Sequence, residues 1–304
     1  MTEPYAGLQA QALGLAEAAG LAPLVRTLKP RWPWSLISAP RWPWPLHAVE
    51  REALAGPKPE LVLSCGGMAG AVAAALRGPE RRVVHVQHPR MALDRFDLIV
   101  VNRHDQVTGP NVIVTRTALH RATPARLAAA AELWRPALAH LPRPLVAVLI
   151  GGTNGRFRLD AAVAETLAAT LGGMMERDRA GLMLTPSRRT DPAATAVFRD
   201  RLNPLGAFVW DGTGDNPYFG MLALADMIVV TIDSVSMVSE AAATNAPVML
   251  APLPGRSRRI GVFTDQMIAE GRVRPFVGRY DHWPVAPLDD TAAAAQEMRH
   301  RLGF

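Results

Sequence analysis

A six-residue apolar run that ends in glycines constrains the fold of this chain most. Residues 145–150 contain only Leu, Val, Ala and Ile, and the segment Gly-Gly-Thr-Asn-Gly at 151–155 follows them directly. A helical pattern begins a few residues later, near Leu159. A strand that is apolar at every position is typical of a parallel sheet with helices on both faces, because both rows of its side chains are buried. The run therefore predicts an α/β domain.

The same alternation of short apolar strands, turns and helices extends over most of the chain. Turn and cap residues separate the segments, such as Gly20 after the first helix and Gly78 after the second. We expect strands at 61–64, 82–87, 97–102, 111–115, 145–150, 181–185, 207–210, 227–231 and 248–251. We expect helices at 8–19, 69–77, 123–139, 159–175, 191–202, 216–224, 234–244 and 259–270.

A proline-rich break at 141–144 divides this pattern into two Rossmann-like halves. The sequence predicts an N-terminal domain over 1–143 and a C-terminal domain over 144–304, with the last helix packing back on the N-terminal domain. An α/β domain normally begins with a strand, yet residues 2–7 resemble only the loop that leads from a strand into the first helix. We therefore expect the first strand of the N-terminal domain to be missing.

Composition and charge limit the classes of partner. The formal net charge of +6, carried mainly by arginine, favours anionic ligands such as nucleotide phosphates or acidic lipid surfaces. No zinc-finger spacing, aromatic RNA-binding signature or lysine-rich tail is present, so nucleic acid is not an expected partner. Cys65 is the sole cysteine, which excludes an intramolecular disulfide and a multi-cysteine zinc site. We predict no metal, and a cytoplasmic protein, because neither a secretory signal nor a spanning run is visible.

Four of the seven tryptophans lie in a repeated Arg-Trp-Pro-Trp segment, at Trp32, Trp34, Trp42 and Trp44. Tryptophan and arginine together suit the boundary between water and lipid, so one interpretation is peripheral contact with an anionic membrane surface on its inner face. The other interpretation is a loop that packs its tryptophans on the first domain's core.

Polar and small residues follow several predicted strands, at the edge where parallel sheets bind ligands. Glycines such as those at 151–155 let backbone N–H groups approach a phosphate, although a tight turn would need the same residues. Ser187 and Arg188 follow the next strand, and Ser234 and Ser236 follow the strand at 227–231. Ser234 is equally suited to capping a helix.

The stretch 222–252 resembles the donor-site segment of two-domain glycosyltransferases of the GT-B type, in which two Rossmann-like domains face a cleft. In those proteins a strand ends in a small-residue loop, and the next helix presents a glutamate to the ribose of a nucleotide sugar. The resemblance implies this role for Glu240. It places Ser234 and Ser236 in the phosphate-facing loop and Gly151, Gly152, Thr153 and Asn154 in the companion turn.

A second resemblance covers nearly the whole chain. It rests on His85-Val-Gln-His-Pro-Arg, Ile150-Gly-Gly-Thr-Asn-Gly, Thr185-Pro-Ser-Arg-Arg-Thr and Gly214-Asp-Asn-Pro-Tyr-Phe-Gly, with further matches near Gln11 and Phe96. These segments are similar to bacterial relatives of the plant elongated-mitochondria fission factor, a family also described as nucleoside-diphosphate-sugar epimerase-like. The resemblance implies a GT-B-like fold and leaves the chemistry open.

The first domain offers fewer candidates for catalysis. His88 and Asp94 follow a strand and are the expected acid–base groups, although a histidine beside a proline often has only a structural hydrogen-bonding role. Arg90 could face the ligand from the same loop. Asp215, Asn216 and Tyr218 precede a helix and are secondary ligand candidates, with Asp215 also suited to capping that helix.

These observations favour a metal-independent glycosyltransferase that uses a nucleoside-diphosphate sugar as substrate, needs no separate cofactor, and acts on an acceptor at or near a membrane. Two alternatives remain open: a non-catalytic nucleotide-binding or membrane-remodelling scaffold, and a nucleotide-sugar epimerase. Fold alone does not choose among them.

Overall fold

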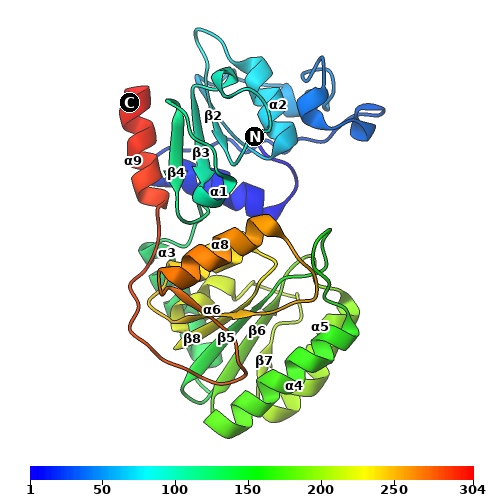
Figure 1. Ribbon diagram of the computed structural model, residues 1–304, viewed down its shortest axis with the longest axis vertical. Helices are drawn as coiled ribbons and strands as arrows, with labels where there is room; N and C mark the ends of the chain where they lie inside the picture. Colours follow the sequence, from blue (N-terminus) through cyan, green and yellow to red (C-terminus); the bar gives the residue numbers. More distant parts are fainter. The chain divides into compact units, whose positions relative to one another are not determined.

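The computed structural model describes residues 1–304, which form two compact units. Unit 1 consists of Met1–Arg121 together with Asp289–Phe304, and unit 2 of Ala122–Leu288. Each unit has its own parallel sheet and its own buried core (Figure 1). None of the helices is both long enough and apolar enough to cross a membrane.

Unit 1 is built on a four-stranded parallel sheet in the order β1-β2-β3-β4. Its strands are β1 (Leu61–Cys65), β2 (Arg82–Val86), β3 (Leu98–Asn102) and β4 (Val112–Thr115). Its α-helices are α1 (Ala6–Ala18), α2 (Gly67–Leu76) and α9 (Thr291–Leu302). Short 3-10 turns complete it: η1 (Trp34–Leu36), η2 (Ala39–Arg41), η3 (Arg51–Leu54), η4 (Leu93–Arg95) and η5 (Arg103–Asp105).

Both faces of this sheet are covered, which explains why its strands are apolar at successive positions. Val84 and Val86 of β2 belong to a cluster with Leu15 of α1 and Met298 of α9. Val83, between those two valines, belongs to a second cluster on the other face that includes residues of α2. Helix α9 therefore packs in unit 1, beside α1, although it is separated from α1 by the entire sequence of unit 2.

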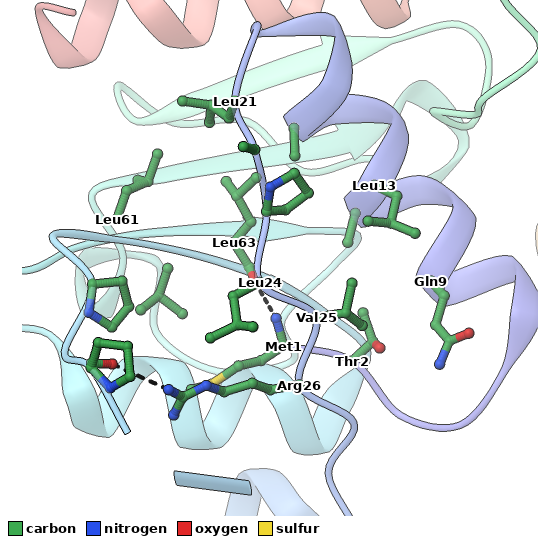
Figure 2. A pocket seen from close by; sticks show the side chains of 17 residues that line it. Met1, Thr2, Gln9, Leu13, Leu21, Leu24, Val25, Arg26, Leu61 and Leu63 are labelled. Atoms are coloured by element: carbon green, nitrogen blue, oxygen red, sulfur yellow. Dashed lines mark hydrogen bonds between the residues drawn. The ribbon is translucent and has the colours of Figure 1, made fainter. Parts of the chain in front are cut away.

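The chain start lies beside β1 and makes isolated bridges there. Thr2 forms parallel bridges with Cys65 on one side and with Thr27 on the other. The Met1 nitrogen donates to the Leu63 carbonyl, as the dashed line between them in Figure 2 shows. The Met1 carbonyl accepts a hydrogen bond from the Cys65 N–H at 3.2 Å, and the Thr2 N–H donates to the Arg26 carbonyl at 3.0 Å. Two residues thus occupy the position of an interior strand beside β1.

Unit 2 has a six-stranded, all-parallel sheet in the order β10-β9-β8-β5-β6-β7. Its strands are β5 (Leu145–Ile150), β6 (Gly181–Pro186), β7 (Phe208–Val209), β8 (Met227–Thr231), β9 (Val248–Ala251) and β10 (Val273–Pro275). Its helices are α3 (Pro124–Leu138), α4 (Ala161–Asp178), α5 (Pro192–Leu202), α6 (Tyr218–Leu224), α7 (Val235–Ala242) and α8 (Arg258–Ala269), with the turn η6 (Asn203–Leu205).

Strand β5 lies in the middle of this sheet, and its six side chains divide between two cores. Val146, Val148 and Ile150 pack in a cluster with residues of α4 and α5, whereas the three alternate residues pack in a cluster with residues of α3, α6, α7 and α8. The fold class predicted from the sequence, two Rossmann-like α/β units, is confirmed.

The division between the units falls at Ala122, about twenty residues before the predicted boundary at Arg143. Helix α3 belongs to unit 2 because it packs against α6, where the Trp134 ring closely approaches the backbone of Gly220. The proline-rich segment is likewise fixed inside unit 2, since Arg143 forms an ion pair with Asp226. Prolines at a chain break were therefore a poor guide to the boundary between compact units.

Candidate functional site

All six strands of the unit 2 sheet are parallel and end at one edge. The loops after β5, β6, β7 and β8 carry most of the predicted ligand residues. The chain runs from β5 through α4 to β6 on one side, and later returns to place β8 on the other side of β5. The loops after β5 and β8 therefore diverge at a topological switch point. In open parallel sheets the crevice at such a point is the usual place for a ligand.

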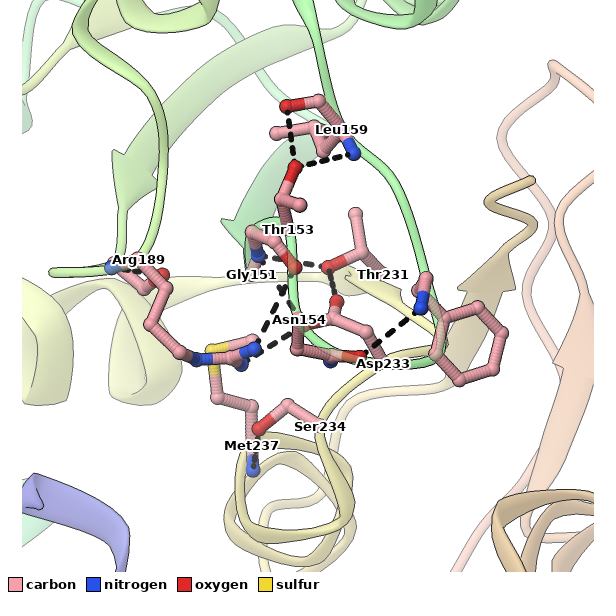
Figure 3. Close-up of polar contacts among 12 residues, drawn as sticks. Gly151, Thr153, Asn154, Leu159, Arg189, Thr231, Asp233, Ser234 and Met237 are labelled. Atoms are coloured by element: carbon pink, nitrogen blue, oxygen red, sulfur yellow. Dashed lines mark hydrogen bonds and ion pairs between the residues drawn. The ribbon is translucent and has the colours of Figure 1, made fainter. Parts of the chain in front are cut away.

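A buried carboxylate, Asp233, connects the loops at this edge of the sheet (Figure 3). Its oxygens accept hydrogen bonds from the Gly152 N–H at 3.1 Å and from the Thr231 hydroxyl at 2.7 Å. Arg189 completes the set with an ion pair of 2.8 Å. The Asp233 side chain is fully buried, whereas 41% of the Arg189 side chain is exposed. The glycine turn thus already holds an anion, which is supplied by the protein itself.

The two glycines of this turn are needed for space. A Cβ on Gly151 would lie 2.1 Å from an Asp233 carboxylate oxygen, and one on Gly152 would lie 2.0 Å from the Arg189 carbonyl oxygen. Gly155, in the same turn, has nothing within 4 Å of a Cβ position. The first two glycines therefore admit the Asp233 carboxylate and the Arg189 backbone.

Thr153 and Asn154, both predicted to bind the donor, are engaged with their own loop. The Thr153 hydroxyl accepts a hydrogen bond from the Leu159 N–H and donates to the Leu159 carbonyl. The Asn154 side-chain oxygen accepts hydrogen bonds from the N–H groups of Arg156 and Phe157. Their placement explains the shape of the loop and leaves their contact with a ligand as a prediction.

The loop after β6 brings the two predicted residues Ser187 and Arg188 to the same edge. The Ser187 hydroxyl accepts a hydrogen bond from the Arg189 N–H and lies 3.2 Å from the Thr190 hydroxyl. Arg188 is exposed and makes no ion pair. The sequence analysis selected Arg188, but the neighbouring Arg189 is the residue that forms an ion pair with the buried Asp233.

A set of exposed arginines surrounds this edge of the sheet. The loops after β5 and β9 run side by side, because Phe157 and Gly255 form an antiparallel bridge and the Arg256 N–H donates to the Arg156 carbonyl. The exposed guanidinium groups without an ion pair on these loops and at the start of α8 are those of Arg156, Arg188, Arg256 and Arg258. Four exposed guanidinium groups without an ion pair therefore lie on loops at the carboxyl edge of unit 2.

Helix α7 begins at the same edge. The Ser234 hydroxyl accepts a hydrogen bond from the Met237 N–H, so Ser234 is the N-cap of the helix (Figure 3). Ser236 lies in the first turn, where backbone N–H groups point out of the helix end. The capping role weighed for Ser234 in the sequence is thus its role in this structure.

Glu240, the residue expected to meet a ribose, lies on α7 and is 7% exposed. Its carboxylate accepts a hydrogen bond of 2.5 Å from the Tyr218 hydroxyl, which comes from the start of α6. Burial raises the pKa of Glu240 to about 7, and the Tyr218 hydrogen bond opposes that rise. Burial, followed by the neighbouring Glu240 charge, raises the pKa of Tyr218 as well. Two residues predicted separately therefore form one hydrogen-bonded pair.

Asn216, not Asp215, shapes the start of α6. The Asn216 side-chain oxygen accepts a hydrogen bond from the Tyr218 N–H at 2.9 Å, whereas Asp215 is exposed. The capping role predicted for Asp215 was one residue out of place. The Asx-type turn at Asn216 also fixes the backbone of Tyr218, whose hydroxyl donates to Glu240.

Arg272 forms hydrogen bonds with the carboxyl end of α7 and was not identified from the sequence. The residue is 4% exposed. Its guanidinium donates hydrogen bonds to carbonyl oxygens at the end of α7, including those of Ala241, Ala242 and Thr244. Burial lowers its pKa to about 10. The five donors of a guanidinium satisfy carbonyls that a helix end leaves without partners.

In unit 1, the structure separates His88 from Asp94. His88 follows β2 at the carboxyl edge of the sheet, where its Nδ1 accepts a hydrogen bond from the Arg90 N–H at 2.9 Å. Asp94 lies in η4, near the amino end of β3, where Arg77 donates to its carbonyl oxygen. The two side chains are at opposite edges, so they do not form an acid–base pair.

The tryptophan segment of unit 1 combines one buried and two exposed rings. Trp42 is 6% exposed and its indole N–H donates to the carbonyl oxygens of Trp34 and Ile37. Trp42 is therefore a core residue, and the prediction that it contacts a membrane is wrong. Trp32 and Trp44 are 82% and 63% exposed. Trp34 is half-buried and meets Trp44 edge-on, with ring centroids 6.3 Å apart.

No cluster of three or more His, Cys, Asp or Glu side chains in the chain is arranged to hold a metal ion.

Among solved structures, a UDP-GlcNAc 2-epimerase from Methanocaldococcus jannaschii is similar, with a TM-score of 0.50 and 12% identity over 81% of this chain and 77% of that one. MurG of Acinetobacter baumannii gives a TM-score of 0.47 and 14% identity, over 99% of this chain and 89% of that one. The likeness to the epimerase, at 12% identity, concerns the fold alone.

Relatives in sequence identify the family. A mitochondrial fission protein ELM1 of Arabidopsis thaliana is 33% identical over 80% of this chain, which spans 64% of that relative's length. An uncharacterized protein, RP120, of Rickettsia prowazekii is 24% identical over 80% of each chain. The model of the mitochondrial fission ELM1 family matches residues 6–302. The chain therefore belongs to the mitochondrial fission ELM1 family.

Proposed function

We propose that unit 2 binds a nucleoside-diphosphate sugar and that the protein is a metal-independent glycosyltransferase of the GT-B type. The observation that carries this proposal is the switch point between β5 and β8, where a helix N-terminus and cationic loops meet at one sheet edge. A diphosphate is the ligand class whose charge and size suit both features.

The phosphates are assigned to the loops after β6 and β8. Arg188 is exposed and unpaired, and Arg189 is held toward the crevice by Asp233. The first turn of α7, with Ser236, adds backbone N–H groups and the positive end of the helix dipole. Together these groups offset the negative charge that develops on a departing diphosphate.

The ribose is assigned to Glu240. A carboxylate that accepts hydrogen bonds can hold two sugar hydroxyls, and Glu240 already accepts one hydroxyl, that of Tyr218. A ribose hydroxyl would replace or join the Tyr218 hydroxyl on this carboxylate. The pKa of Glu240 is about 7. Ligand hydroxyls favour the charged carboxylate, so they would bind more weakly below that pH.

In the proposed reaction an acceptor hydroxyl oxygen forms a bond to the anomeric carbon of the sugar. The bond between that carbon and the diphosphate oxygen breaks, and its electron pair leaves with the nucleoside diphosphate. The acceptor proton passes to a base, and His88 is our candidate because it is exposed at the carboxyl edge of the unit 1 sheet.

The test is calorimetric titration of the protein with uridine, guanosine, cytidine and thymidine diphosphates and their sugars. We expect one nucleotide to bind, and Arg188→Ala to weaken it by about tenfold, the loss of one charge-assisted contact. Arg201→Ala is the matched control, because Arg201 lies in the last turn of α5, at the amino edge of the sheet. Absence of binding to the folded wild-type protein would overturn the proposal.

Turnover separates the enzyme from the alternatives. Release of free nucleoside diphosphate from the bound sugar nucleotide, lost in His88→Ala with binding retained, supports the transferase. Interconversion of the sugar without release of the diphosphate would identify an epimerase. Binding without either reaction would favour the non-catalytic nucleotide-binding scaffold.

We also propose peripheral attachment to an anionic membrane, because a specific surface of unit 1 favours it. Trp32, Leu36, Ile37 and Trp44 are 45–82% exposed in the segment between Lys29 and Ala48, which contains no acidic residue. Exposed rings beside Arg31 and Arg41 suit the lipid headgroup region.

Sedimentation with vesicles tests this attachment. We expect binding to phosphatidylglycerol vesicles and little binding to phosphatidylcholine vesicles. The double variant Trp32→Ser/Trp44→Ser should lose it, while Leu133→Ser, which removes an exposed apolar side chain of unit 2, should not. Equal binding of both variants would contradict the assignment.

A further inference from the structure

Two loops of unit 2, which follow β5 and β9, carry arginines to which the proposed nucleotide site assigns no role. Residues 156–158 are Arg-Phe-Arg, and residues 256–259 are Arg-Ser-Arg-Arg. Neither 151–159 nor 252–264 contains an acidic residue. Five guanidinium groups are therefore concentrated on two short segments.

The backbones of these loops are joined in a fixed register. Phe157 and Gly255 form an antiparallel bridge, so Arg156, which precedes one, and Arg256, which follows the other, also lie opposite each other. The Arg256 N–H donates to the Arg156 carbonyl at 3.1 Å. A Cβ on Gly255 would lie 2.1 Å from the same carbonyl oxygen, so glycine is needed for the loops to approach this closely.

Hydrogen bonds within the first loop fix the backbone that carries Arg156. The Asn154 side-chain oxygen accepts from the Arg156 N–H at 2.8 Å and from the Phe157 N–H at 3.0 Å. The Asn154 N–H donates to the Phe157 carbonyl at 2.9 Å. Phe157 is buried, whereas its neighbours Arg156 and Arg158 are exposed, as expected where side chains alternate between two faces. The arginines thus lie on the outer face of a preorganised loop.

This arrangement of charges is unfavourable for the protein alone. Like charges directly opposite each other on antiparallel segments are destabilising, and neither Arg156 nor Arg256 forms an ion pair. Arg158, by contrast, pairs with Asp160 at 3.2 Å. Arg258 is the first residue of α8, at the positive end of the helix dipole, where a cation is disfavoured. A bound anion would relieve both kinds of repulsion.

The side chains favour phosphate among the anions. The planar fork of a guanidinium matches phosphate oxygens with paired hydrogen bonds, and a phosphate monoester carries nearly two negative charges at neutral pH. The two loops expose no large apolar or aromatic side chain, because Phe157 and Phe263 are buried. They therefore offer no ring on which the base of a nucleic acid could stack.

We propose that Arg156 and Arg256, assisted by Arg258, bind a phosphate group that is distinct from the diphosphate of the nucleotide site. The group is a phosphate monoester, carried either by a soluble molecule or by the headgroup of an anionic lipid such as phosphatidic acid. This proposal does not depend on nucleotide binding, which is assigned to Arg188 and α7.

Calorimetric titration with inorganic phosphate, at an ionic strength held constant with sodium chloride, tests the site. We expect Arg156→Gln/Arg256→Gln to weaken phosphate binding at least about tenfold. Arg201→Gln, at the amino edge of the sheet, and Arg188→Gln, in the nucleotide site, should keep the wild-type affinity. Equal binding by the wild type and the double variant, or a loss in Arg188→Gln alone, would overturn the proposal.

Melting temperatures test the repulsion without a ligand. At low salt and without phosphate, Arg256→Gln should raise the melting temperature by about 1–3 °C, because Arg156 loses its like-charged neighbour. Added sodium chloride should reduce this difference. Arg201→Gln removes an arginine that is paired with Glu165 and should give no such increase. A lower melting temperature for Arg256→Gln would contradict the repulsion on which the proposal rests.

Vesicles distinguish the two sources of the phosphate. The variant Trp32→Ser/Trp44→Ser, in which the exposed rings of unit 1 are removed, is sedimented with phosphatidylcholine vesicles that contain phosphatidic acid. Sedimentation that is lost when Arg156→Gln/Arg256→Gln is added would assign the phosphate to a lipid headgroup. Phosphate binding in the calorimeter without such sedimentation would assign it to a soluble phosphate ester. Absence of both would overturn the proposal.

Discussion

Arg189 and Asp233 form an ion pair of 2.8 Å across the switch point of unit 2, between the loops that follow β6 and β8. The carboxylate is fully buried and the guanidinium is partly exposed. Arg189 is therefore a partly exposed cation at the switch point whose charge is already offset by the protein. A phosphate that enters the crevice must compete with Asp233 for this arginine.

We expect Asp233→Asn to lower stability and to strengthen nucleotide binding. The amide keeps one acceptor oxygen but loses the ion pair and one of the accepted hydrogen bonds, at a cost of about 1–3 kcal/mol in the free energy of unfolding. Arg189, no longer neutralised, should bind a diphosphate several-fold more tightly. Urea unfolding and calorimetry measure the two effects, with Asp200→Asn as the control because Asp200 is an exposed surface residue. Weaker nucleotide binding in Asp233→Asn would contradict the competition.

The glycine turn offers a sharper comparison. Gly152→Ala places a Cβ 2.0 Å from the Arg189 carbonyl oxygen, a backbone atom that can move only with its loop. We expect a loss of about 3 kcal/mol or more in the free energy of unfolding, or failure to fold. Gly155→Ala meets nothing within 4 Å and should change stability by less than about 0.5 kcal/mol. Similar losses for both variants would show that the turn's flexibility, rather than its packing, requires glycine.

Arg272→Met should destabilise unit 2 although it removes a buried charge. Four carbonyl oxygens at and beyond the end of α7 would lose their buried donor, and such groups cost about 1–3 kcal/mol each when left without a partner. Partial relaxation of the helix end should keep the total near 3 kcal/mol, measured by urea unfolding. Arg272→Lys should recover only part of this, because one ammonium cannot reach all of these carbonyls. A fully stable Arg272→Met variant would show that water replaces the guanidinium.

The architecture was predictable because the strands are buried on both faces. Residues 145–150, 227–231 and 248–251 are continuous apolar runs, and the strands there begin and end as predicted. Strand β10 and the 3-10 turns around the tryptophans lack such a run and were not predicted. The unit boundary depends on which helix packs on which sheet, a long-range property that prolines at 142 and 144 do not encode.

The site was predictable only at the level of strand ends. Sequence order places Gly151, Ser187 and Ser234 at one sheet edge, and the structure brings those loops together. Which of two adjacent arginines turns inward depends on tertiary packing, so Arg188 was chosen over Arg189. Arg272 follows a helix, far along the chain from α7, and its hydrogen bonds to α7 carbonyls have no local sequence signal. Asp233, two residues after the buried strand β8, had the signal of a site residue.

Glu240 should make stability depend on pH. Its folded-state pKa of about 7 lies above the ordinary value of 4.5, so the folded protein retains a proton that the unfolded chain has lost between these values. The contribution of Glu240 to the free energy of unfolding is fully present below pH 4.5 and is lost as the pH rises through 7. Since one pKa unit corresponds to about 1.4 kcal/mol and the pKa rises from 4.5 to about 7, the loss is at most about 3.5 kcal/mol.

Glu240→Gln isolates this effect, because the amide stays neutral and its oxygen can still accept the Tyr218 hydrogen bond. Relative to wild type, we expect the variant to be more stable at pH 8 than at pH 5, by up to about 3 kcal/mol in urea unfolding. Glu176→Gln, at an exposed position of α4, should show no such dependence. A pH-independent difference for Glu240→Gln would mean that the carboxylate is solvated in solution, and hence that α7 stands further from α6 than the Tyr218 contact implies.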